Sequence, residues 1–435
     1  MSDVGASLGL AGQKVLDVHT DPDPGAGGNQ QEEEKLKKYI FKYTTLEGYF
    51  LQDDPNTKAQ DFEFMKTNFG LIQRPYDSDK KLPDHGQGMT SWQRFENHIT
   101  SLNNAAKKRR HVSGRSSTTQ HKLLFLGRHG NGYHNIAERY YGNQAWNCHY
   151  SALDGDPDGV MTWADAHLSE EGRRQAKEVN AFWKTQIEEQ KMNLPQAYYV
   201  SPLDRAMETA EITFKGLIPS PGFQPTVMER LREGSGIHTC DRRSPVSYIR
   251  RRYPSYITTR DPLLTETDEF WNAVHREPDK ALKARMRKFL DTLMRSEENE
   301  RISFTSHSGA IGAMLKVLGH RQFSLGTGSV IPVLVRVDKI DVIDDKRVKR
   351  HGGKVEGGKH AQLDSAAAAA ADDDDNEDNE VEDHEDDQSK WPTIPSCPAD
   401  MDLENIGRQR WGMGLDKYLE GVEDGTLKLE EVAFR

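Results

Sequence analysis

The 435-residue sequence predicts an α/β fold, a three-layer sandwich with a mostly parallel central sheet and helices on both faces. Three short apolar runs each lead through a polar turn into a helical pattern: Leu123–Leu126, Ala197–Val200 and Ile302–Thr305. Strands that alternate with helices in this way are typical of a parallel sheet. A long polar stretch from Thr239 to Asn299, between two sheet elements, predicts a helical or loop insertion over the site.

The first half of the chain offers clear start signals for its elements. We expect order to begin at Tyr39–Thr45, and the spacing of apolar residues predicts a helix over Trp92–Leu102. Ser169 is followed by Glu170 and Glu171, which suits the positive end of a helix dipole, so a helix should start there.

In the second half, Pro202 stands where the helix after Ala197–Val200 would begin. Further elements are expected at Val227–Leu231 (strand), Lys280–Met294 (helix), Ala310–Leu318 (helix) and Val330–Val337 (strand). Pro332 lacks an amide N–H, which places the last strand at an edge of the sheet.

Charge and cysteine content narrow the function classes. The formal net charge is -11, but Asp372–Gln388 alone carries twelve acidic residues, so the remainder is close to neutral, at about +1. A near-neutral folded part argues against a nucleic-acid binder driven by general basicity. The three cysteines, Cys148, Cys240 and Cys397, are odd in number and widely spaced, which predicts neither a disulfide framework nor a metal site and favours a reducing compartment.

Reactive side chains stand at each of the three strand-to-helix junctions. The first carries Arg128 and His129, the second Arg205 and the third His307. Because the carboxyl ends of parallel strands open on one edge of a sheet, these side chains should converge on one pocket. Two arginines and two histidines suit a dianionic phosphoryl group, with one histidine as nucleophile. Glu233, in the loop after the next apolar run, offers a proton donor for a leaving alkoxide.

These motifs resemble the histidine phosphatase superfamily, which includes the cofactor-dependent phosphoglycerate mutases. The resemblance is carried by Arg128-His129-Gly130 with Asn135, by Leu168–Ala176, by Ser201–Ala210 and by Ser306–Gly309. The segment Arg232–Arg243 is similar to a phosphoglycerate mutase-like or phosphomutase-like branch and departs from the glycolytic mutases. The resemblance covers roughly residues 120–340.

The resemblance implies a phosphohistidine mechanism that needs no metal and no cofactor. His129 would be the nucleophile, while Arg128, Arg205 and His307 would hold the phosphoryl group with help from Asn135.

Two further assignments concern the proton donor and a second anion site. Glu233 would be the proton donor by its similarity to the family's Leu-x-Glu element, and Glu229 is a competitor for that role. Arg242 and Arg243 could recognise a second anionic group of the substrate, or they could simply be solvated.

The domain organisation follows from composition and from the resemblance. Residues 1–35 predict a disordered tail, and 36–344 a histidine-phosphatase-like catalytic domain with its core motifs at 120–340. Residues 345–390 are of low complexity and acidic, which predicts disorder. The segment 391–435 recovers apolar residues and is expected to dock back as a helix.

The leading hypothesis is a phosphatase that acts on a small phosphorylated metabolite, with a phosphomutase as the alternative enzyme. A non-catalytic interaction protein, whose acidic tail contacts basic proteins, is a third possibility. We expect no nucleic-acid partner, because the folded part is nearly neutral, and no membrane partner, because no long apolar run is present. The oligomeric state stays open. A cytoplasmic location is expected, and Lys107-Lys-Arg-Arg110 leaves a nuclear one open.

Overall fold

The computed structural model describes residues 39–113, 118–219, 221–341 and 387–427. Its centre is a six-stranded sheet with the strand order β1-β6-β2-β5-β3-β4. The strands are β1 (Tyr39–Thr45), β2 (Thr118–Arg128), β3 (Ala197–Val200), β4 (Thr226–Val227), β5 (Arg301–Ser306) and β6 (Val330–Asp341). Strands β2, β5, β3 and β4 pair in parallel, and β6 is antiparallel to both of its neighbours. The mostly parallel α/β sheet that the sequence predicts is confirmed.

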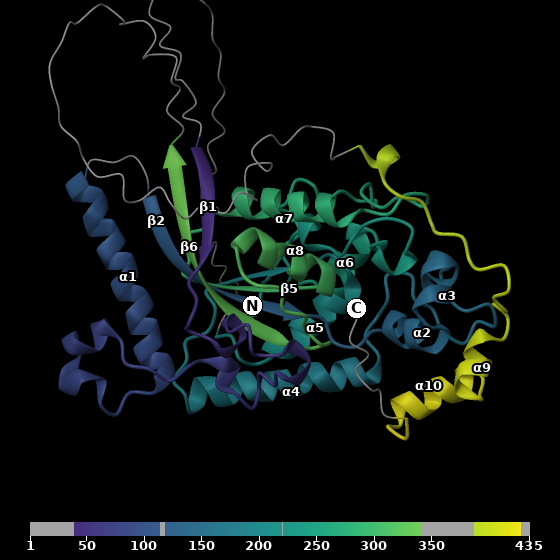
Figure 1. The fold of residues 1–435 in the computed structure, drawn as a ribbon, viewed down its shortest axis with the longest axis horizontal. Coiled ribbons are helices and arrows are strands. Elements are labelled where there is room, and N and C mark those ends of the chain that lie inside the picture. Colours follow the sequence, from purple (N-terminus) through teal and green to yellow (C-terminus); the bar gives the residue numbers. More distant parts are fainter. Residues whose placement is uncertain (1–38, 114–117, 220, 342–386, 428–435) are drawn as a thin grey trace, which may run out of the picture. The chain divides into compact units, whose positions relative to one another are not determined.

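Helices cover both faces of this sheet, as Figure 1 shows. One face carries α1 (Ser91–Ser113), α4 (Glu170–Glu188) and α5 (Asp204–Phe214), and the other carries α7 (Asp279–Leu293) and α8 (Ser308–Leu318). Alternate side chains of β2 pack on opposite faces of the sheet. Leu123 and Phe125 pack with α1 and α4, and Leu124 and Leu126 pack with α7 and α8. This alternation is the two-residue period of a strand buried on both sides.

Local signals place the helix ends. The Ser169 hydroxyl accepts a hydrogen bond from the Gly172 N–H at 3.2 Å, so it caps α4 as predicted. Helix α8 ends at Gly319, which has a left-handed φ of 71° that other residues adopt only with strain. Helix α1 continues to Ser113, well beyond the predicted Leu102, so Lys107 and Lys108 are exposed on a helix.

The predicted edge position of the last strand is wrong, because β6 lies between β1 and β2. Pro332 is nevertheless tolerated there. Strand β1 pairs with β6 only from Val335 onward, so Pro332 lies beyond its end. The Pro332 carbonyl accepts a hydrogen bond from the Gln52 side chain at 3.0 Å, so it points away from β2, and the ladder to β2 needs no N–H from this residue.

The segment between β3 and β5 also differs from expectation. Strand β4 has only two residues, and Glu229–Leu231 forms a 3-10 turn where a strand was predicted. Helix α6 (Val246–Arg252) packs against α5, and α7 joins the helical layer beside α8. Apart from α6, the insertion is therefore mostly irregular over roughly 232–278.

The C-terminal segment, residues 387–427, holds α9 (Ile406–Trp411) and α10 (Leu415–Glu423). Figure 1 shows both beside α2 (Tyr133–Tyr141) and α3 (Asn143–Cys148), with which they share an aromatic cluster. A disulfide joins Cys148 to Cys397, so the prediction of no disulfide is wrong, and Cys240 alone is unpaired and buried. The two cysteines are 249 residues apart and meet only because this segment folds back.

The predicted disordered segments, 1–35 and 345–390, lie almost wholly outside the described residues. Among the residues that the structure describes, no helix combines the length and the apolar character needed to cross a membrane.

Candidate active site

The three strand-to-helix junctions meet at one edge of the sheet. Arg128, the last residue of β2, is in register with Ser306, the last residue of β5. Val200 at the end of β3 is in register with Thr305. The residues that follow these strand ends are therefore neighbours, which brings Arg128, His129, Arg205 and His307 together.

These four residues form a compact, enclosed group that we call the phosphoryl cage. Their exposed fractions are 6% for Arg128 and 2% or less for His129, Arg205 and His307. The ring centroids of His129 and His307 are 5.0 Å apart. A third imidazole, His134 of α2, lies with its ring centroid 5.4 Å from that of His129. Sequence reasoning missed His134, although it stands in the same motif five residues after His129.

The hydrogen bonds of His129 define which ring nitrogen is reactive. Its Nδ1 lies 2.7 Å from the carbonyl oxygen of Gly130, which can only accept a hydrogen bond. Nδ1 therefore carries the proton, and Nε2 has the free lone pair. Burial, and then the charges of Arg205 and Arg128, hold the pKa of His129 well below its usual value. The imidazole is consequently neutral at neutral pH, as a nucleophile must be.

His307 is placed by a different contact. Its Nε2 lies 2.7 Å from the hydroxyl oxygen of Ser201, at the end of β3. Burial, followed by the charge of Arg205, lowers the pKa of His307 well below its usual value. Its Nδ1 is buried and has no hydrogen-bond partner among the described residues, and the same holds for Nε of Arg205.

A buried carboxylate from the insertion orients Arg205. The Nη2 of Arg205 donates to Oδ1 of Asp241 at 2.8 Å, and Nη1 of Arg276 donates to Oδ2 at 2.8 Å. Burial acts to raise the pKa of Asp241, but the charges of Arg276 and Arg205 outweigh it and lower that pKa to about 2. Asp241 is therefore ionised and fixes the Arg205 fork. Neither Asp241 nor Arg276 was singled out from the sequence, because no local pattern marks such a partner.

The loop after His129 is fastened by the two helices that carry the other motifs. The Gly130 N–H donates to the Thr209 hydroxyl of α5 at 2.9 Å, and Gln175 of α4 accepts from the Asn131 N–H at 2.8 Å. A Cβ on Gly172 would lie 2.0 Å from the Asn131 carbonyl, so only glycine permits this approach. Asn135 accepts from the Gly132 N–H at 3.0 Å through Oδ1 and so closes the loop.

The two candidate proton donors occupy different environments. Glu233 is half-buried and accepts from the N–H groups of Gly309 and Ala310 at 2.9 and 3.0 Å, beside His307. Glu229 is fully buried, and its two oxygens pair with Arg232 at 2.8 Å and Arg243 at 2.7 Å. The position of Glu233, and not that of Glu229, suits contact with a group bound in the phosphoryl cage.

The predicted second anion site at Arg242 and Arg243 is not assembled. All five N–H donors of Arg243 are engaged, by Glu229 and by main-chain carbonyls of residues 244, 265, 266 and 267. Arg242 is half-buried, pairs with Asp154 at 2.7 Å and lies over the Trp271 ring. Arg243 therefore has no donor left for a substrate, and Arg242 as a substrate contact stays a prediction.

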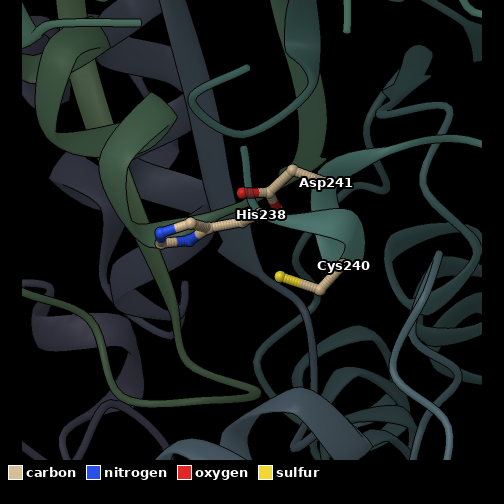
Figure 2. Close-up of side chains that lie close together, drawn as sticks. All are labelled: His238, Cys240 and Asp241. Atoms are coloured by element: carbon tan, nitrogen blue, oxygen red, sulfur yellow. The ribbon is translucent and has the colours of Figure 1, made fainter. Parts of the chain in front are cut away.

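One group of potential metal ligands borders the cage. Figure 2 shows His238, Cys240 and Asp241 on one turn, with one potential ligand atom of each within 4.8 Å of the others. Both oxygens of Asp241 already form ion pairs, one with Arg205 and one with Arg276. The positive charges of these two guanidinium groups disfavour the binding of a cation here. Burial, and then the charge of Arg276, lower the pKa of His238 to about 3. Burial raises the pKa of the Cys240 thiol well above its usual value, away from the thiolate that metals prefer. The turn is better explained as a wall of the cage.

Comparison with known proteins identifies the family. Residues 156–330 match the model of the histidine phosphatase superfamily (branch 1), a segment that contains Arg205, Glu233 and His307 and begins after His129. A "Probable phosphoglycerate mutase" of Arthroderma benhamiae is 46% identical over 300 residues, which cover 68% of this chain and 85% of that protein. The chain belongs to the histidine phosphatase superfamily.

Two further similarities accompany this membership. "Phosphomutase-like protein 3" of Candida albicans is 30% identical over 68% of this chain and 81% of that protein. The crystal structure of a phosphoglycerate mutase from Thermus thermophilus aligns with 51% of this chain and 99% of that chain, at 21% identity and a TM-score of 0.26. As a superfamily member of the phosphoglycerate mutase-like kind, the protein is an enzyme of the histidine phosphatase and phosphomutase type.

Proposed function

We propose that the protein is a phosphatase that hydrolyses a small phosphorylated metabolite through a phosphohistidine at His129. The observation that carries this proposal is the state of the His129 ring. Its Nδ1 proton is committed to the Gly130 carbonyl, its pKa is depressed, and its free Nε2 lies among two arginines and His307.

The proposed chemistry uses residues of the cage and Glu233. The Nε2 lone pair of His129 attacks phosphorus as the ester P–O bond breaks, and Glu233, in its protonated form, gives a proton to the leaving alkoxide. Water then attacks the phosphohistidine, Glu233 takes a proton from that water, and phosphate leaves with His129 restored. The buried Nε–H of Arg205 is a donor for a phosphoryl oxygen, and Nδ1 of His307 is a second donor in the tautomer in which the Ser201 hydroxyl donates to Nε2.

A phosphomutase is the second candidate, and the enclosure of the cage favours it. A mutase must keep water from the phosphohistidine until a second hydroxyl receives the phosphoryl group. His129, Arg205 and His307 are all at most 2% exposed, so water has little access in this conformation. Incubation with 3-phosphoglycerate separates the two activities, because an isomer without free phosphate indicates a mutase and free phosphate indicates a phosphatase.

Phosphoenzyme trapping tests the shared intermediate. The wild type should acquire acid-labile, base-stable phosphate from a phosphomonoester panel, and His129→Ala should not, while substitution of the exposed His85 by alanine should have no effect. Full phosphatase activity in His129→Ala would contradict the proposal.

A further inference from the structure

A small pocket lies between α2 and the loop that follows His129. Its walls include Asn131, Asn135, Glu138, Arg139, Thr327 and Arg410. Asn131 lies two residues after His129, and Gly328, next to Thr327, donates its N–H to the His129 carbonyl at 2.9 Å. The pocket therefore shares two of its walls with the loop that presents the nucleophile.

Arg139 brings one positive charge to this pocket from within the catalytic domain. It lies on the last turns of α2 with its guanidinium near the Tyr418 hydroxyl, and its Nη1 is buried with no hydrogen-bond partner among the described residues. A buried guanidinium nitrogen without a partner is costly, so this donor is suited to a ligand.

Arg410 brings the second positive charge from α9 of the C-terminal segment. Its Nη1 lies 3.3 Å from where a Cβ of Gly142 would be, and Gly142, with a φ of 82°, has no side chain to block the approach. Within the described part of the chain, Arg410 forms no salt bridge. Its guanidinium is 5.8 Å from the ring centroid of Trp411, which leaves its donors available.

Close packing fixes α9 on α2 and so fixes the position of Arg410. Gly407 lies so close to the Tyr140 ring that a Cβ there would come within 2.0 Å of a ring carbon. The Tyr140 hydroxyl donates to the Met413 carbonyl at 3.0 Å, and the Cys148–Cys397 disulfide ties the same segment to α3. Arg410 is thus held over the pocket by contacts on both sides of it.

We propose that Arg139 and Arg410 bind a second anionic group of the substrate, a carboxylate or a second phosphate, while its transferable phosphoryl group occupies the cage. The inference rests on the proposed function, because it requires a phosphoryl group at His129. Glu138 does not oppose it strongly. Burial raises the pKa of this carboxyl to about 7, against the opposing charges of Arg128 and Arg139, so it is only partly ionised at neutral pH. With two arginines and a partly neutral glutamate, the pocket carries a net positive charge.

The test compares three phosphomonoesters that differ in their second group: glycerol 3-phosphate has none, 3-phosphoglycerate has a carboxylate and glycerol 1,3-bisphosphate has a second phosphate but no carboxylate. We measure kcat/KM for total phosphoryl-group consumption with the wild type, Arg410→Ala and Arg408→Ala. Arg408 is exposed on the same helix but is not part of the pocket, so it is the matched control.

We expect the wild type to prefer at least one of the two anionic compounds over glycerol 3-phosphate. Arg410→Ala should lower that preference about ten-fold, the value of a charge-assisted hydrogen bond, and Arg408→Ala should leave it unchanged. The compound whose preference is lost identifies the anion as carboxylate or phosphate. Activity without such a preference, or a preference that survives Arg410→Ala, would overturn this inference alone. Inactivity of the wild type toward all three compounds and the wider panel would overturn the proposed function as well.

Discussion

Arg205 donates from Nη2 to Oδ1 of Asp241 at 2.8 Å, and the exposed fractions of the two residues are 1% and 2%. This pair links the second strand-to-helix junction to the insertion. Because Arg276 binds the other oxygen of Asp241, one carboxylate holds two buried guanidinium groups.

Asp241→Asn should therefore damage both stability and catalysis. Two buried arginines would lose their full negative partner, so the free energy of unfolding should fall by about 3 kcal/mol. A loosened Arg205 should lower kcat/KM by about ten-fold or more. Urea unfolding and steady-state kinetics measure the two effects. The control is Asp154→Asn, which removes an exposed pair with Arg242 and should cost less than about 1 kcal/mol. Equal effects of the two substitutions would contradict this account.

Glu233→Gln and Glu229→Gln should give different defects. A glutamine at 233 retains an oxygen for one of the two N–H groups, of Gly309 and Ala310, that donate to the two carboxylate oxygens, but it cannot donate the carboxyl proton. We expect a loss of about 100-fold in kcat with alkyl phosphates and a much smaller loss with p-nitrophenyl phosphate, whose leaving group needs no proton. Glu229→Gln would instead break two buried ion pairs and lower the urea midpoint. Any loss of kcat in this variant should be the same for both kinds of substrate. A leaving-group dependence seen only in Glu229→Gln would assign the acid to Glu229.

The buried histidines predict a loss of stability in acid. Burial lowers the pKa of His238 to about 3, and the pKa values of His129 and His307 are also lowered. The unfolded chain binds these protons near pH 6.5, so stability is complete above that pH and declines as the pH falls from about 6.5 toward 3. Each such histidine contributes a slope of up to about 1.4 kcal/mol per pH unit.

Urea unfolding at pH 7.5 and pH 5 measures that slope. His238→Asn should show a shallower dependence than the wild type, and replacement of the exposed His85 by asparagine should leave the dependence as it is. A slope that is the same in all three proteins would show that His238 does not titrate in this way.

Reduction of the Cys148–Cys397 disulfide should loosen the C-terminal segment. Loss of a native disulfide typically costs about 2–4 kcal/mol, and here the loss should appear first as faster proteolysis within 387–427. The Cys148→Ser/Cys397→Ser double variant should be cleaved at this faster rate with or without reductant. If reductant further accelerated cleavage of the double variant, the effect would not come from this bond.

The parts of the site that lie next to strand ends could be predicted from the sequence, and their partners could not. Arg128, His129, Arg205 and His307 each follow an apolar run, and parallel pairing brings such positions together whatever the loops do. Asp241, Arg276 and His134 depend on the path of the insertion and on the orientation of α2. Arg243 was predicted as a substrate contact because of its charge. Its actual partners, such as Glu229 and the Thr265 carbonyl, come from other parts of the insertion, and their approach could not be predicted from the sequence either.

The order of the strands in the sheet also could not be predicted from local sequence patterns. The apolar run of β6 and its Pro332 were visible, but the pairing of β1 with β6 joins segments almost 300 residues apart. The Cys148–Cys397 bond likewise depends on residues that meet only in the finished fold.

The docking of α9 on α2 has a consequence for the order in which the protein is made. Helix α2 is synthesised early, yet the residues that cover Tyr140 come about 265 positions later, after all six strands. At translation rates of about 5–20 residues per second, an aromatic face beside the catalytic loop waits on the order of ten to fifty seconds for its cover. The aromatic face of α2 is therefore among the last parts of the nascent chain to be covered, and it is a natural place for a chaperone to act.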